Sequence, residues 1–126
     1  MAVLELNQEN FESTVLDNDF VIVDFWAPWC GPCRAFAPTF EAAAEKYTDI
    51  TFAKVNTEVE QGIAASFQIR SIPTLMIFRE KVIIYSQPGS LPASGLDDLI
   101  TKVRELDMVQ VHKEIAEEQA AQTDKA

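Results

Sequence analysis

An apolar run that leads into a pair of cysteines constrains this chain more than any other feature. Residues 20–26 are apolar except for Asp24 and show no polar alternation, which is typical of a central strand covered on both faces. The run ends just before Pro28, and the only two cysteines, Cys30 and Cys33, follow at once. We therefore predict a buried strand that delivers both cysteines to the start of a helix.

Periodicity and turn residues divide the rest of the chain into alternating strands and helices. Predicted strands cover residues 3–6, 20–26, 50–56, 74–78 and 82–85, and predicted helices cover residues 7–18, 31–47, 58–67 and 92–103. This order predicts an α/β fold with a mixed central sheet of about five strands, flanked by four helices.

The last two predicted strands lie close enough in sequence to form a hairpin. A tight type I′ turn needs positive φ at both central residues, which Glu80 and Lys81 do not favour, so we expect another turn type or a strained one. Pro88 has no amide donor, so that end of the last strand should be frayed or at a sheet edge.

Composition and charge bound the class of protein. The chain has 126 residues, 48% of them hydrophobic, and a formal net charge of −10, which predicts a single domain and argues against nucleic-acid binding. The N-terminus lacks the features of a signal peptide, and no apolar run is long enough to cross a bilayer. We therefore expect a cytoplasmic protein without membrane contact, in a compartment that keeps thiols reduced.

A segment of twenty residues, 107–126, follows the last helix of the predicted domain, residues 1–106. Asp107 and Gln110 have the spacing of a capping box, so we expect a further helix to about Ala116 and fraying beyond it. An apolar stripe on this helix either packs on the domain or docks a partner; its residues are Met108, Val111 and Ile115. His112 is expected to face solvent.

The Cys-x-x-Cys spacing at a helix start suits disulfide exchange. Residues at i and i+3 face the same way, with Cα atoms about 5–6 Å apart, which a disulfide tolerates. Cys30 lies at the helix N-terminus, where the macrodipole and free N–H groups stabilise the attacking thiolate. Cys33, one turn further in, is placed to resolve the mixed disulfide, and Pro32 suits the first helical turn.

Two other interpretations of the cysteine pair are weaker. Structural zinc normally needs four ligands, and the chain offers two cysteines and the distant His112, so we expect no metal site. Inert buried cysteines are disfavoured by Gly31 and Pro32, which place the pair at a chain reversal.

Asp24 is the candidate proton acceptor for Cys33. It interrupts an apolar strand, and burial raises the pKa of a carboxyl group toward neutral pH, where it can take and return protons. The alternative is a structural aspartate bonded to backbone. Of the two tryptophans, Trp26 is expected in the core and Trp29 on the surface that meets the substrate.

Residues 21–33 resemble the active-site segment of the thioredoxin family nearly throughout. Pro38 matches the proline that kinks the active-site helix, Pro73 matches a cis proline opposite the cysteines, and Gly89 matches the glycine after the hairpin. The resemblance covers roughly residues 3–106 and implies the thioredoxin fold, with the remaining residues as a C-terminal helical extension.

The resemblance implies a role for each matching position. It makes Cys30 the nucleophile, Cys33 the resolving thiol and Asp24 the buried base. It places Lys54 beside that carboxylate and Ile72 where its backbone pairs with an extended substrate segment; otherwise Lys54 is a surface strand lysine. The substrate-contacting residues that it implies are Trp29, Gly31, Pro32, Ile72, Pro73 and Gly89, with Trp26 and Pro38 in supporting positions.

The function implied by the resemblance is protein-disulfide reduction. The redox group is the Cys30–Cys33 disulfide, with no bound cofactor, and electrons pass from NADPH through thioredoxin reductase to disulfide-containing client proteins. Two alternatives remain: a binding or chaperone module that docks through residues 107–126, and a thiol oxidase or isomerase. The Gly-Pro pair between the cysteines and the missing signal peptide disfavour the second.

Overall fold

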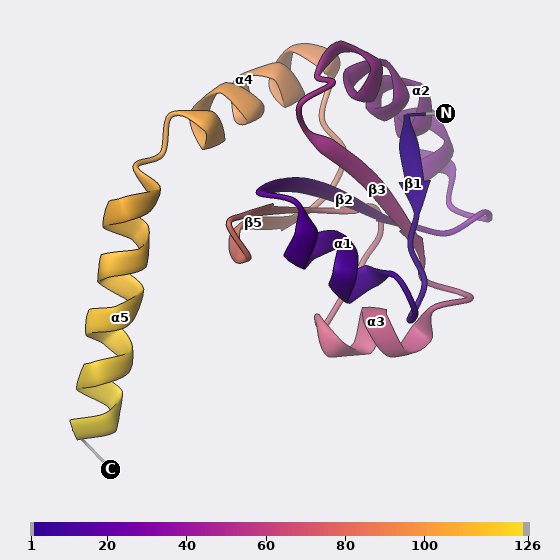
Figure 1. The fold of residues 1–126 in the computed structure, drawn as a ribbon. Helices are drawn as coiled ribbons and strands as arrows, with labels where there is room; N and C mark the ends of the chain where they lie inside the picture. The colour runs from indigo at the N-terminus through magenta and orange to yellow at the C-terminus, as the bar shows by residue number, and fades with distance from the viewer. Residues whose placement is uncertain (1, 125–126) are drawn as a thin grey trace.

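A computed structural model describes residues 2–124 and contains a five-stranded sheet with helices on both faces (Figure 1). The strands are β1 (Val3–Glu5), β2 (Phe20–Trp26), β3 (Thr51–Asn56), β4 (Thr74–Arg79) and β5 (Val82–Pro88). The helices are α1 (Phe11–Asp17), α2 (Gly31–Lys46), α3 (Gln61–Ser66), α4 (Ala93–Arg104) and α5 (Met108–Asp124). The predicted fold class, including the helical extension, is confirmed.

The sheet is mixed, with strand order β1-β3-β2-β4-β5. β1 and β2 both run parallel to β3, whereas β4 is antiparallel to β2 and β5 is antiparallel to β4. β2 is the central strand, as its apolar run predicts, and its inner residues from Val21 to Phe25 are all buried. Within it, Asp24 is in register with Lys54 on β3 and Leu75 on β4.

Each face of the sheet carries its own apolar core, because successive residues of a strand point to opposite faces. Ile22 packs with Phe36 and Phe40 of α2 and with residues of α4. Val23 and Phe25 pack on the other face, with residues of α1 and α3. By the same alternation, Asp24 lies on the face that α2 and α4 cover.

The sequence predicts either a strained type I′ turn or another turn type for the β4–β5 hairpin, and the structure has the strained one. Glu80 and Lys81 have φ values of 50° and 71°, so both central residues adopt the left-handed conformation of a type I′ turn. That conformation costs roughly 1–2 kcal/mol for each residue with a side chain. β5 lies at the edge of the sheet and ends at Pro88, in agreement with the missing donor.

α5 is longer than predicted, since it continues past Ala116 to Asp124. The residues beyond Ala116 are mostly Glu, Gln and Ala, which have high helix propensity and need no tertiary contact to favour the helix. Residues 125–126 of the predicted extension lie outside the described residues. Nowhere in residues 2–124 is a helix both long and apolar enough to cross a membrane.

The start of α5 contacts the domain as far as His112, and its far end projects away from it (Figure 1). The Asp107 carboxylate accepts the Gln110 N–H at 3.2 Å, which is half of the predicted capping box. Met108 is buried. His112 is exposed, as predicted. Its Nε2 also lies 3.1 Å from Glu80 Oε1 in the hairpin turn, a contact across 32 residues that no local pattern reveals.

Candidate active site

The junction between β2 and α2 holds both cysteines. Cys30 is the N-cap of α2 and Cys33 lies in its first turn, with their Cα atoms 5.2 Å apart and their sulfurs joined in a disulfide. The Cys33 N–H donates to Cys30 Sγ at 3.2 Å. This N–H is one of the free donors at the helix N-terminus, so the helix itself provides a partner for a negative charge on Cys30.

The backbone of the Ile72–Pro73 segment faces Cys30 and is tied in turn to Gly89. The Ile72–Pro73 peptide bond is cis, as the family resemblance predicts, and Ile72 O lies 3.8 Å from Cys30 Sγ. Pro73 O accepts the Gly89 N–H at 2.7 Å. Gly89 has a φ of 103°, a conformation that side chains disfavour, so a glycine suits this position.

The surface around the disulfide combines an exposed rim with buried sulfurs. Trp29 is 64% exposed, and Gly31 and Pro32 are also exposed. Cys30 and Cys33 are 5% and 2% exposed. Trp29, Gly31 and Pro32 therefore lie on the surface next to Cys30, whereas Ile72 is partly buried and Pro73 is buried.

Asp24 is a buried carboxylic acid on the sheet face that α2 covers. It is 4% exposed, and its Oδ1 has no hydrogen-bond partner within residues 2–124. Burial raises the pKa of Asp24 from its ordinary value of 3.8 to about 7, although the positive charge of Lys54 opposes the increase. A carboxyl group with this pKa exchanges protons near neutral pH.

Lys54 lies next to Asp24 on the neighbouring strand, but its closest polar contact is with Glu5. Its Nζ lies 3.9 Å from Glu5 Oε1 and 5.1 Å from the centroid of the Trp26 ring. Trp26 is partly buried, and its indole Nε1 has no hydrogen-bond partner in the described part of the chain. Lys54 thus acts on Asp24 through its charge, without a hydrogen bond.

Pro38 lies inside α2 on an exposed position, one helical turn and more from the cysteines. It lacks the N–H that would pair with the carbonyl of Arg34, four residues earlier. The kink expected at this point stays a prediction. Pro38 therefore lies more than one helical turn beyond Cys33.

Two contacts that stabilise the site were missed from the sequence. Arg34 Nη1 donates to the Pro28 carbonyl at 2.9 Å, which ties the loop before Cys30 to the first turn of α2. Thr57 donates its N–H and its hydroxyl to the Trp26 carbonyl, at 2.8 and 3.1 Å. Arginine and threonine at such positions carry no local signal, because their partners are set by the tertiary fold.

The arrangement can perform thiol–disulfide exchange. The disulfide at the N-terminus of α2 can be reduced and re-formed. A buried carboxylic acid, Asp24, lies on the face of the sheet that α2 covers. No group of three or more His, Cys, Asp or Glu side chains that could bind a metal occurs among residues 2–124. The Cys30–Cys33 disulfide is the group that can undergo the exchange.

Comparisons with known proteins agree with this geometry. The Thioredoxin family model matches residues 2–102. The chain is 53% identical over 119 residues to "Putative thioredoxin 2" of Streptomyces coelicolor, which covers 94% of this chain and 89% of that protein. It is 44% identical over 104 residues to "Thioredoxin" of Porphyra purpurea, which covers 81% and 97%.

Among solved structures, a mutant thioredoxin from Halobacterium salinarum superimposes with a TM-score of 0.76 at 34% sequence identity. The match covers 82% of this chain and 92% of that chain. The Streptomyces match is long enough to include part of α5, whereas the family model ends before it.

Proposed function

This chain belongs to the thioredoxin family and is a protein-disulfide oxidoreductase that works by dithiol–disulfide exchange, and we propose that Cys30 attacks and Cys33 resolves. The observation that supports this order is the hydrogen bond from the Cys33 N–H to Cys30 Sγ. In the reduced protein the same donor stabilises a thiolate on Cys30, and the thiolate is the attacking species.

In the first step, the Cys30 thiolate attacks one sulfur of a client disulfide. A bond forms between Cys30 Sγ and that sulfur, and the other client sulfur leaves as a thiolate. The cis Ile72–Pro73 backbone lies opposite Cys30, and we assign it the role of holding an extended client segment by strand-like pairing. Trp29, Gly31, Pro32 and Gly89 form the rest of the proposed client surface.

In the second step, Cys33 attacks Cys30 Sγ and the Cys30–Cys33 disulfide re-forms. The second client sulfur leaves with the bonding electron pair, so the client gains two electrons and the protein loses two. We assign Asp24 as the acceptor of the Cys33 proton, since its pKa of about 7 suits both uptake and return. Lys54 tunes this pKa through its charge.

The substrates are disulfide-containing proteins, and we propose that thioredoxin reductase, supplied with NADPH, returns the protein to its dithiol form. The similarity to thioredoxins of Streptomyces coelicolor and Porphyra purpurea supports the reductase direction. We also propose a cytoplasmic location, because a reductant that must be recharged suits a compartment that keeps thiols reduced.

We propose that residues 1–106 form the catalytic domain and residues 107–126 an extension outside it. The family match over residues 2–102 supports this division, as does the N-cap at Asp107, which begins a separate helix.

A turbidity assay with insulin and dithiothreitol tests the function. The wild-type protein should accelerate precipitation, because insulin chains separate when their disulfides are reduced. Cys30→Ser should return the rate to that of dithiothreitol alone, while Val109→Ser, a change at an exposed position on α5, should leave it at the wild-type value. Equal rates for wild type and Cys30→Ser would overturn the proposal.

A further inference from the structure

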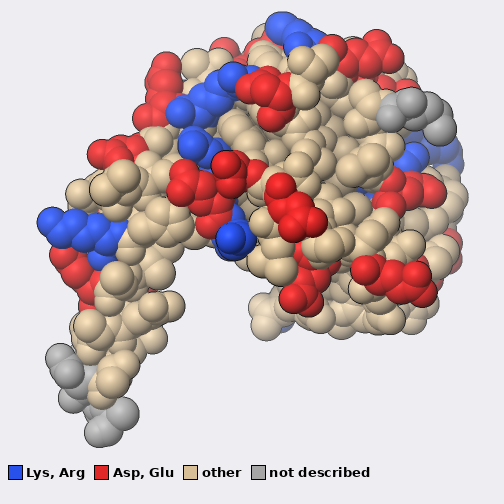
Figure 2. Space-filling model, viewed as in Figure 1, with Lys and Arg blue, Asp and Glu red and all other residues tan. Residues whose placement is uncertain are grey.

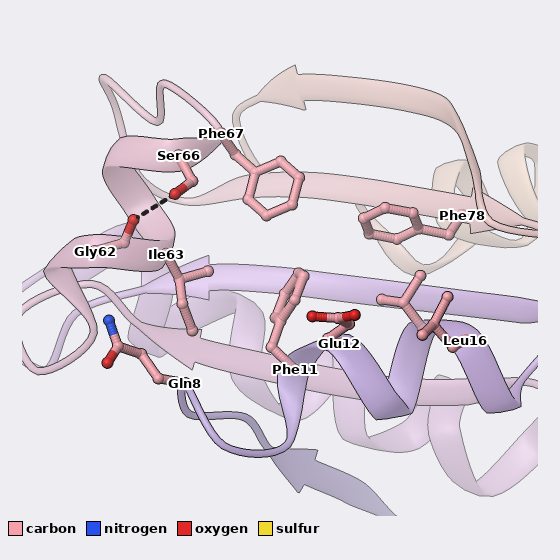
Figure 3. A pocket seen from close by; sticks show the side chains of 10 residues that line it. Gln8, Phe11, Glu12, Leu16, Gly62, Ile63, Ser66, Phe67 and Phe78 are labelled. Atoms are coloured by element: carbon pink, nitrogen blue, oxygen red, sulfur yellow. Dashed lines mark hydrogen bonds between the residues drawn. The ribbon is translucent and has the colours of Figure 1, made fainter.

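A groove between α1 and α3 is not used by the disulfide chemistry. It has a volume of about 690 Å³, within the range of pockets that bind ligands. Figure 3 shows Phe11, Ile63 and Phe67 pointing into it from the two helices, with Phe78 of β4 at its floor. Leu16, at one end, is 48% exposed, so the groove offers apolar surface that is open to solvent.

The floor of the groove is a rigid aromatic cluster. The ring centroid of Phe11 lies 5.3 Å from that of Phe67 and 6.3 Å from that of Phe78, and the Phe67 and Phe78 centroids are 6.2 Å apart. Phe78 is buried and fixed in the sheet. A partner side chain entering the groove would therefore meet preformed apolar surface, which reduces the ordering cost of binding.

The two chain segments that wall the groove carry only negatively charged side chains. Residues 1–33, which include α1, contain no Lys, Arg or His, and neither do residues 55–69, which include α3. Of the eight acidic side chains in these two stretches only Glu5 has a cationic partner within 4.0 Å among residues 2–124. The other seven are Glu9, Glu12, Asp17, Asp19, Asp24, Glu58 and Glu60, and Glu12 lines the groove itself. Figure 2 shows red side chains spread over this face, with most of the blue ones over α2, α4 and the start of α5.

We propose that the groove between α1 and α3 is a docking site for a basic amphipathic helix of a partner protein. Apolar side chains of that helix fill the groove over Phe11, Phe67 and Phe78, and its Lys and Arg side chains face the acidic rim. A length of about 10 Å, set by the seven residues of α1, admits roughly two turns of helix.

A helix fits this site better than an extended segment. The groove lies on a sheet face and is walled by two helices, so it offers no free strand edge for backbone pairing. A helical partner satisfies its own backbone hydrogen bonds and can bind through side chains alone. The α5 helix of a second copy is a poor occupant, because its exposed positions include Glu114, Glu117 and Glu118, which the acidic rim repels.

The test uses a fluorescein-labelled helical peptide with leucines at i, i+3, i+4 and i+7 and lysines on the flanking positions. Fluorescence anisotropy should report binding to the wild-type protein with a micromolar Kd that weakens severalfold as salt is raised. The Cys30→Ser/Cys33→Ser variant should bind equally well, which separates this site from the disulfide and keeps the result independent of the proposed function.

Two substitutions at exposed groove positions locate the site. Leu16→Ser removes apolar contact and should weaken binding at least about tenfold. Glu12→Lys reverses one rim charge and should weaken binding at least about fivefold. Matched changes elsewhere, Val109→Ser on α5 and Glu45→Lys on α2, should leave the Kd within twofold. All four variants should keep wild-type insulin reduction, which shows that they fold.

Several results would overturn the proposal. One is equal binding of a peptide with the same composition in which the leucines are scattered around the helix. Another is equal binding of a peptide with glutamine in place of lysine, since that removes the charge argument. Unchanged affinity in both Leu16→Ser and Glu12→Lys would place the peptide elsewhere, and a dimer of the full chain that Leu16→Ser dissociates would assign the groove to a second copy.

Discussion

The β2–α2 junction and helix α5 are held in the fold in opposite ways. At the junction, Cys30, Cys33 and Asp24 are all at most 5% exposed, and the Ile72 carbonyl oxygen lies 3.8 Å from Cys30 Sγ. In α5, Met108 is buried and His112 makes a partly exposed contact with Glu80, while the helix beyond Ile115 is exposed. Burial changes the chemistry of side chains at the junction, whereas solvent keeps contacts along α5 weak.

This difference explains where reactivity arises. Desolvation moves the pKa of Asp24 to about 7, and a helix N-terminus provides a donor to Cys30. The hydrogen bond between His112 and Glu80 is roughly half exposed on both sides, and such exposed contacts contribute about 0–1 kcal/mol. Changes at the junction should therefore alter activity by orders of magnitude, and changes in α5 should alter stability modestly.

The largest effect is expected for Cys33→Ser. Without the intramolecular second attack, whose effective concentration reaches about 10⁵ M in well-oriented systems, turnover should fall at least about 1,000-fold. The mixed disulfide between Cys30 and the client should accumulate and appear as an adduct on a non-reducing gel, with its mass confirmed by intact-protein spectrometry. Cys30→Ser should form no adduct; an adduct through Cys33 would reverse the assigned order.

Asp24→Asn should stabilise the protein in a pH-dependent way. The native carboxyl holds its proton to about pH 7, whereas the unfolded one releases it near 3.8, so rising pH favours the unfolded state between these values. The free energy of unfolding of the wild-type protein therefore falls by about 4 kcal/mol by pH 8.

Urea unfolding at pH 4 and pH 8 measures this effect. The variant should exceed the wild type at pH 8 by up to about 4 kcal/mol and match it closely at pH 4. A difference of the same size at both pH values would show that the carboxyl group does not titrate in this window.

Deletion of residues 107–126 should cost a smaller amount. It uncovers the surface that Met108 buries, and full burial of such a side chain contributes about 1.5–3 kcal/mol. Insulin reduction per folded molecule should be unchanged, because no described contact joins α5 to the disulfide. Lost reduction in a shortened protein that still folds would contradict the separation of the two regions.

The smallest effect is expected for Lys81→Gly in the hairpin turn. Its φ of 71° strains a side chain but not glycine, and after the entropic cost of glycine the net gain should be about 0.5–1 kcal/mol. The same substitution at Lys102, inside α4, should destabilise by about 1 kcal/mol. Thermal unfolding of the two variants compares their stabilities directly. A Lys81→Gly variant less stable than the wild type would contradict the claim that Lys81 is strained.

The sequence predicted best where local pattern and burial coincide. The bounds of β2 were predicted to the residue, since Asp19 precedes the apolar run and Pro28 breaks it. α1 begins at Phe11, later than predicted, because Asn7 uses its side chain to accept the Glu9 and Asn10 N–H groups of a separate turn. Helix propensity also explains why α5 ends later than the apolar stripe alone predicted.

Features that depend on long-range contacts could not be predicted from the local sequence pattern. The cis bond at Pro73 was expected from the family resemblance, not from its dipeptide, because few X-Pro bonds are cis. The contact between His112 and Glu80 joins a helix to a turn, and the groove between α1 and α3 exists only once both helices pack on β4. No local periodicity encodes either feature.

The most direct test of the account is alkylation of the reduced protein at neutral pH, followed by mass mapping of the modified cysteine. The N-terminal donor of α2 should make the Cys30 thiolate the reactive species, so iodoacetamide should modify Cys30 at least about tenfold faster than Cys33. Equal and slow modification of both cysteines, or faster modification of Cys33, would contradict the account.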